Sequence, residues 1–157
     1  HSAFNSRARQ IVAEPRTPEQ KTVCDQLWAG ELTTVEKLRH YYDVLGPLYS
    51  VKYNAAEAKL GRERSIMNPE ALNRAFAPGG FLQSYDLRPE LKNITAPTLI
   101  IAGRHDWICA PEFSEEIHRL IPGSDLRIFE ESSHSVRVDE PQKFIDAVAG
   151  FIVYRGR

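Results

Sequence analysis

Two side chains of this sequence could perform acid–base chemistry together, the carboxylate of Asp106 and the imidazole of His134. Asp106 follows an apolar run through the turn Gly103-Arg104-His105, and His134 lies in the segment Ser132-Ser133-His134-Ser135. In an acyl-transfer triad the imidazole takes a proton from a nucleophile, while the carboxylate fixes the tautomer and stabilises the imidazolium. The sequence of 157 residues contains no G-x-S-x-G motif, which would carry a Ser nucleophile. The pair is therefore predicted to be an acid and a base whose nucleophile lies elsewhere.

The segments around this pair predict that both side chains meet at one edge of a parallel sheet. Thr98 to Ala102 is a continuous apolar run too short for a helix, as in a strand covered on both faces. A helical pattern over 111–121 follows, then a second strand candidate from Leu126 to Phe129, then a helix opened by Pro141. This order indicates a right-handed βαβ unit with parallel strands. Since each side chain follows one strand, we expect the pair at the carboxyl edge, where open α/β sheets hold their sites.

Residues 5–85 carry helix signals and no convincing strand. Thr17-Pro18-Glu19-Gln20 combines a capping Thr, a Pro at the first helical position and a Gln three residues after the cap, and Gly30 ends this helix. Thr33-Thr34-Val35-Glu36 starts a second helix, and Asn68-Pro69 starts a third. This half is predicted to be a set of short helices.

The two predicted strands are too few for a stable parallel sheet. Each face of such a sheet must be covered, and each edge must be paired or protected. We therefore expect polypeptide outside this sequence to complete the sheet, in agreement with the missing nucleophile motif.

Several motifs of the second half carry a family resemblance. They are Ile94 to Asp106, Ile121-Pro122-Gly123-Ser124, Ser133-His134-Ser135 and Asp139-Glu140-Pro141. Together they resemble the C-terminal third of an α/β-hydrolase, and within that superfamily they are similar to the capped esterase, proline iminopeptidase and haloperoxidase-like group. The resemblance implies the C-terminal part of a doubly wound parallel α/β sheet, preceded by a helical cap or lid. Residues 1–4 would end a core strand, residues 5–85 would form the cap, and residues 86–157 would belong to the core.

By this resemblance Asp106 is the triad acid and His134 the triad base. The implied reaction is hydrolysis of a small-molecule ester or amide through an acyl-enzyme, as in an esterase, an amidase or an aminopeptidase-like enzyme. The nucleophile Ser and the oxyanion hole would come from an N-terminal half, either a proteolytic half or a separately encoded subunit. A non-catalytic ligand-binding module with a hydrolase-like fold, or an inactive fragment, remains an alternative.

Aromatic side chains are the candidates for a substrate pocket, since such pockets are mostly apolar. Trp107 directly follows the triad acid, at the rim where cap and sheet should meet. Trp28, Tyr49 and Tyr53 in the predicted cap are the other candidates.

Composition limits the partners and cofactors. The formal net charge of -1 gives no electrostatic case for nucleic acid or an anionic membrane, and no apolar run approaches the roughly 20 residues of a spanning helix. We expect no nucleic-acid or membrane partner. Cys24 and Cys109 show no disulfide or metal spacing, which favours a reducing compartment and a cytoplasmic location. A zinc site of His105, Asp106 and His134 is an alternative. Because His105 and Asp106 are adjacent, their side chains should point different ways. We therefore expect no metal and no cofactor.

Overall fold

The computed structural model describes residues 17–155, which form two compact units. The first unit contains residues 17–48 and 53–85, and the second contains residues 49–52 and 86–155. Residues 49–52, expected in the helical cap, therefore pack with the second unit although their chain neighbours on both sides belong to the first. The strand end expected at residues 1–4 lies outside the described residues.

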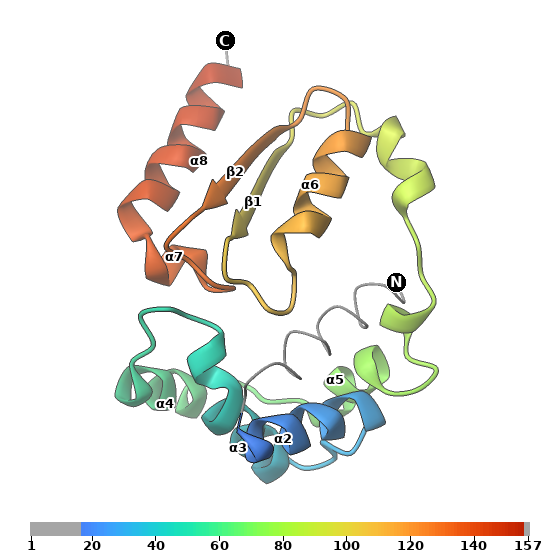
Figure 1. The fold of residues 1–157 in the computed structure, drawn as a ribbon, viewed down its shortest axis with the longest axis vertical. Helices are drawn as coiled ribbons and strands as arrows, with labels where there is room; N and C mark the ends of the chain where they lie inside the picture. Colours follow the sequence, from blue (N-terminus) through green and yellow to red (C-terminus); the bar gives the residue numbers. More distant parts are fainter. Residues whose placement is uncertain (1–16, 156–157) are drawn as a thin grey trace. The chain divides into compact units, whose positions relative to one another are not determined.

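Helices are the regular elements of the first unit, as its capping signals predict. They are α2 (Pro18–Ala29), α3 (Val35–Leu45), α4 (Ala55–Glu63) and α5 (Pro69–Phe76), with short 3₁₀ turns at Gly46–Leu48 and Phe81–Gln83 (Figure 1). Both hydrogen bonds of the predicted capping box join Thr17 and Gln20, and α2 ends where Gly30 takes a left-handed φ of 75°. Thr34 and Asn68 accept capping hydrogen bonds at α3 and α5. α4 has no counterpart among the predicted helices.

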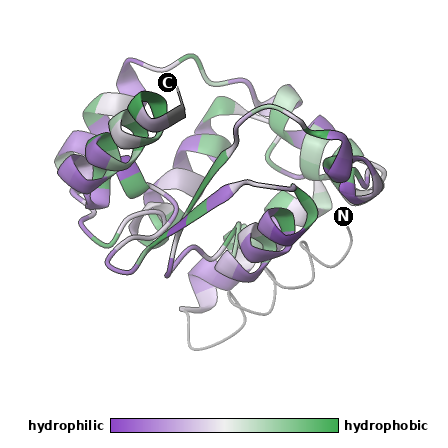
Figure 2. Cartoon of the chain, turned by 90° about the horizontal axis from the view of Figure 1, so that it is seen from above, coloured by the Kyte–Doolittle hydropathy of each residue, from purple (hydrophilic) through white to green (hydrophobic). Residues whose placement is uncertain are grey.

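The first unit has its own apolar core. Hydrophobic and hydrophilic residues are interleaved along the helices, the pattern of helices with one buried face (Figure 2). The buried side chains of α2 and α3 are Val23, Cys24, Leu27, Trp28, Leu38, Tyr41 and Leu45. Trp28 meets Phe76 of α5 edge to face, with ring centroids 5.4 Å apart, so this contact joins two helices of the unit. None of the helices in residues 17–155 is both long enough and apolar enough to cross a membrane.

The second unit contains the predicted parallel strands. Its elements are the 3₁₀ helix Arg88–Asn93, β1 (Leu99–Gly103), α6 (Pro111–Leu120), β2 (Asp125–Phe129), α7 (Val136–Asp139) and α8 (Pro141–Arg155). β1 and β2 pair in parallel, with a register that runs from Leu99 opposite Asp125 to Gly103 opposite Phe129. In Figure 1 the two strands lie between α6 and α8, and α6 packs on both strands. The predicted strand–helix–strand order and parallel pairing are confirmed.

Coverage of β1 differs from the expectation of a strand buried on both faces. Leu99, Ile100 and Ile101 are half-buried, whereas Ala102 and Gly103 at the carboxyl end are buried. The reason is that the sheet formed by residues 17–155 has two strands, so part of its apolar surface has no covering layer among these residues. The end of β1 that leads to Asp106 is thus the well-packed end.

Candidate active site

The turn after β1 holds Asp106 in a fixed orientation. One carboxylate oxygen of Asp106, Oδ1, accepts the backbone N–H groups of Ile108 and Cys109, each at 2.9 Å. An Asp that bonds the backbone two and three residues further on stabilises its own turn. The side chain is only 7% exposed, and its second oxygen, Oδ2, points at His134.

The loop after β2 brings His134 to this carboxylate. Its backbone is tied to the turn after β1, because His105 N–H donates to the Ser132 carbonyl at 2.9 Å and the Ser133 hydroxyl donates to the His105 carbonyl at 3.1 Å. Gly103 permits this close approach, since a Cβ at residue 103 would lie 2.1 Å from the Ser133 carbonyl oxygen. The two chain segments that carry the acid and the imidazole are therefore in direct backbone contact.

Asp106 and His134 form the dyad that the sequence predicts. His134 Nδ1 lies 2.9 Å from Asp106 Oδ2, with the His134 side chain 40% exposed. The hydrogen bond with Asp106, aided by Cys109, raises the pKa of His134 to about 10, although burial acts in the opposite direction. With Nδ1 engaged by the carboxylate, Nε2 is the nitrogen left to exchange a proton with another group.

Cys109 joins the pair in an arrangement that residue spacing did not suggest. Ligand atoms of Asp106, Cys109 and His134 all lie within 4.8 Å of one another, and the Cys109 thiol is exposed. His105, a member of the alternative metal site, is absent from this group of the described residues. A metal ion bound here would have to replace the hydrogen bond between His134 and Asp106. The geometry thus suits proton transfer. The sequence feature that could have placed Cys109 near the dyad is its position three residues after Asp106, whose carboxylate accepts the Cys109 N–H.

The four aromatic candidates separate into two pairs. Tyr49 meets the His134 ring edge to face at 5.5 Å between centroids, and it meets the Trp107 ring in the same way at 5.7 Å. Trp107 is buried, and its indole N–H has no hydrogen-bond partner within residues 17–155. Trp28 and Tyr53 lie in the first unit, where the Trp28 indole N–H donates to Cys24 and Tyr53 packs against the Gly46 backbone. Tyr49 and Trp107 are thus the aromatic side chains at the dyad.

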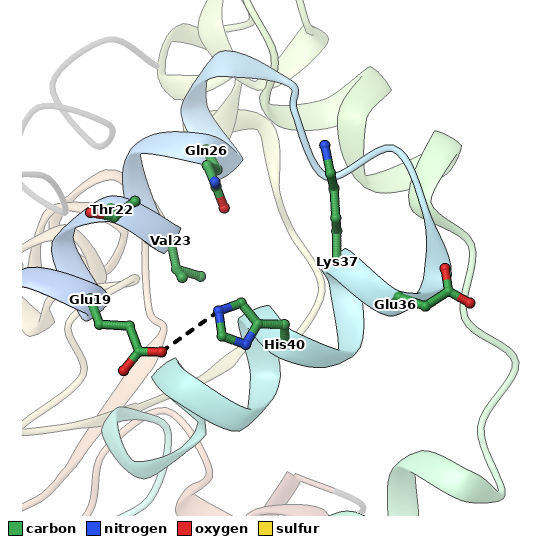
Figure 3. Close-up of a pocket in the computed structure, with 7 residues that line it drawn as sticks. All are labelled: Glu19, Thr22, Val23, Gln26, Glu36, Lys37 and His40. Atoms are coloured by element: carbon green, nitrogen blue, oxygen red, sulfur yellow. Dashed lines mark ion pairs between the residues drawn. The ribbon is translucent and has the colours of Figure 1, made fainter.

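A surface cavity is lined by residues of the first unit alone and includes neither member of the dyad. It has a volume of about 500 Å³. Its lining residues, drawn in Figure 3, are Glu19, Thr22, Val23, Gln26, Glu36, Lys37 and His40. An ion pair of 3.8 Å joins Glu19 and His40 across the cavity. Both side chains are largely exposed, so this pair is a weak surface interaction.

Comparison with known proteins points to one fold. No protein-family model matches the sequence. The chain is 33% identical over 104 residues to the proline iminopeptidase PfmaB of Pestalotiopsis fici, covering 66% of this chain and 36% of that protein. It is 31% identical over 150 residues to a pimeloyl-[acyl-carrier protein] methyl ester esterase of Vibrio vulnificus, covering 94% of this chain and 56% of that protein.

Solved structures give the same result. An α/β fold family hydrolase from Bacillus anthracis superposes with a TM-score of 0.72 at 25% identity, over 96% of this chain and 54% of that chain. The proline iminopeptidase of Mycobacterium smegmatis superposes with a TM-score of 0.66 at 20% identity, over 97% of this chain and 52% of that chain. The chain therefore spans about half the length, or less, of the proteins it matches.

Proposed function

The chain has the fold of a C-terminal portion of an α/β-hydrolase, and its relatives are hydrolases, so we propose that Asp106 and His134 are the acid and base of a hydrolase triad. The observation that carries the proposal is the 2.9 Å contact between His134 Nδ1 and a buried carboxylate. The proposed reaction is hydrolysis of a small-molecule ester or amide, because the relatives are named as proline iminopeptidases and methyl ester esterases.

In this mechanism neutral His134 accepts the proton of a Ser hydroxyl at Nε2 while the Ser oxygen attacks the substrate carbonyl. The imidazolium then donates that proton to the departing alcohol or amine, which leaves an acyl-enzyme. Water repeats the sequence, giving its proton to His134 and releasing the acid and the Ser. Asp106 remains ionised throughout and stabilises the imidazolium across its bond to Nδ1.

The nucleophile and the oxyanion donors belong, in this proposal, to an N-terminal portion outside the sequence. Two features favour a covering polypeptide: the half-buried strand β1 and exposed apolar side chains on α8. The α8 side chains are Ile145, Ile152, Val153 and Tyr154. Covering His134 would also lower its pKa from about 10, because burial disfavours the imidazolium, and so would bring the neutral base nearer to physiological pH.

The compartment is the remaining part of the proposal. Cys24 and Cys109 are both free thiols. Free thiols, one of them exposed beside His134, favour a reducing compartment such as the cytoplasm.

Labelling with a fluorophosphonate probe tests the proposal. The tagged chain is expressed in its source cells, purified under native conditions with whatever polypeptide it binds, and treated with the probe. We expect the label on a Ser outside this sequence, since the chain lacks a nucleophile motif. A label on a Ser of this chain would overturn the assignment.

Substitutions in the active preparation test the individual roles. His134→Ala and Asp106→Asn should each lower turnover on the order of 10⁴-fold, by analogy with the chymotrypsin triad. Their effects should be far from additive, because both disable one unit. The exposed neighbour His105 supplies the control, and His105→Ala should retain near-normal turnover. Normal turnover in His134→Ala would refute the proposed base.

A further inference from the structure

Asp139 is a second buried carboxylate beside the dyad, with no part in the proposed proton transfer. It ends α7, five residues after His134, and its side chain is 0% exposed. Within residues 17–155, Asp106 and Asp139 are the buried carboxylates. A buried charge requires hydrogen-bond partners, so the groups that surround Asp139 indicate what it holds in place.

Both oxygens of Asp139 accept hydrogen bonds. Oδ2 accepts the backbone N–H of Ser133 at 2.8 Å, in the residue directly before His134. Oδ1 accepts the hydroxyl of Ser50 and the backbone N–H of Lys52, the latter at 3.2 Å. Burial alone would raise the pKa of Asp139, but the hydrogen bonds from Ser50 and from backbone N–H groups outweigh it and lower the pKa. The side chain is therefore an ionised acceptor with donors on both sides.

These bonds connect two segments that are far apart in the sequence. Oδ2 fixes the backbone that leads into His134, and Oδ1 fixes residues 50–52. Ser135 adds a parallel link, because its N–H donates to the Tyr49 carbonyl at 2.8 Å. The Tyr49 ring meets the imidazole edge to face, at a centroid distance of 5.5 Å. Asp139 thus lies between the loop that carries His134, residues 130–135 and here called the imidazole loop, and the segment that carries Tyr49.

Glu140 holds the outer part of the same loop. Its Oε2 accepts the Ser132 hydroxyl at 2.7 Å and the Glu131 N–H at 3.2 Å, and Lys143 pairs with Oε1 at 2.9 Å. The Glu140 side chain keeps 11% of its surface exposed and has the Lys143 ammonium as a counter-ion, whereas the Asp139 side chain is 0% exposed. Loss of the Asp139 acceptor is therefore the more disruptive of the two.

We propose that Asp139 is a positioning residue for His134, holding the imidazole loop and residues 49–52 together so that Nδ1 stays on Asp106. This role rests on the proposed use of His134 as the base. The requirement is for a carboxylate, because Ser133, Ser50 and Lys52 all present donors to it. An Asn at this place has one acceptor oxygen, and its amide N–H group would face a donor on one side.

The titration of His134 tests this inference without any need for activity. The chain of 157 residues is labelled with ¹³C-histidine, and the imidazole signals are followed by NMR against pH; a spectrum of His134→Ala assigns the His134 signal among the five histidines. In Asp139→Asn we expect the pKa of His134 to fall by at least one unit, a tenfold weaker hold on the proton, because the contact with Asp106 loosens. The Nδ1–H signal should also be lost to exchange.

Two further variants keep the test decisive. Asp146→Asn makes the same substitution at an exposed carboxylate of α8 and should leave the His134 titration unchanged. Ser50→Ala removes one donor from Asp139 without creating a buried mismatch, and it should lower the pKa of His134 by a smaller amount. This variant decides the matter if Asp139→Asn does not fold.

The outcomes separate the two proposals. If folded Asp139→Asn has the wild-type pKa of His134, the positioning role is overturned. If Asp139→Asn does not fold, a wild-type pKa of His134 in Ser50→Ala overturns it. Asp106→Asn serves as the reference for the dyad and should lower the pKa of His134 the most. If Asp106→Asn leaves that pKa unchanged, the proposed triad assignment fails instead.

Discussion

Replacement of Gly103 by Ala is the most direct test of how the dyad is assembled. Gly103 ends β1 against the loop that carries His134, and a Cβ there would lie 2.1 Å from the Ser133 carbonyl oxygen and 2.7 Å from that of Ser132. Both obstacles are backbone atoms, so no side-chain rotation relieves the clash. Ordinary contact begins at 3.4 Å, and the loop would have to move by about 1.3 Å.

A displacement of this size breaks specific hydrogen bonds. It lengthens the 2.9 Å contacts of His134 with Asp106 and of His105 N–H with the Ser132 carbonyl to about 4 Å, beyond hydrogen-bond range. Overpacking costs about 1–3 kcal/mol, and each lost bond costs about 0.5–1.5 kcal/mol, with the dyad at the low end because His134 is partly exposed. We expect Gly103→Ala to lower the free energy of unfolding of the second unit by about 2–5 kcal/mol.

Urea unfolding followed by circular dichroism measures this effect. Gly150→Ala is the matched control, because Gly150 lies within α8 and a Cβ there meets nothing within 4 Å. That substitution should stabilise the unit by about 0.5–1 kcal/mol, since Gly is unfavourable inside a helix. The same chemical change should therefore have opposite signs at the two positions. A Gly103→Ala protein as stable as wild type would refute the close packing of β1 on the imidazole loop.

Two further measurements probe the site. The pKa of His134 is raised from 6.5 to about 10 in the folded chain, so its ion pair with Asp106 stabilises the fold fully below about pH 6.5, and this contribution is lost as the pH rises toward 10. The difference in unfolding midpoint between wild type and Asp106→Asn should accordingly shrink from pH 6 to pH 9.5, and a difference that grows would contradict the ion pair. The exposed thiol of Cys109 should react with a disulfide reagent in the folded chain, whereas buried Cys24 should react only on unfolding. Equal reaction rates of the two thiols would show that the buried face of α2 is not packed as described.

Local signals in the sequence were sufficient for most elements. The capping box at Thr17 and the prolines that open α6 and α8 act within a few residues, so these helix starts are predictable and are confirmed. α4 was not predicted although Asn54 and Glu57 have the spacing of a helix start, because no residue of this helix is buried and no apolar face marks it in the sequence. The parallel pairing of β1 and β2 followed from the order of elements, since one helix between two strands allows no other simple connection.

The same topology was enough to anticipate that Asp106 and His134 meet, because the carboxyl ends of neighbouring parallel strands share one edge. Tertiary structure alone decided what surrounds the pair. Ser50 and Asp139 are separated by 89 residues, and no local pattern marks either as a partner of the other. Contacts of this range depend on how whole segments pack, and it is this packing that sets Tyr49 against His134 and buries a second carboxylate beneath the imidazole loop.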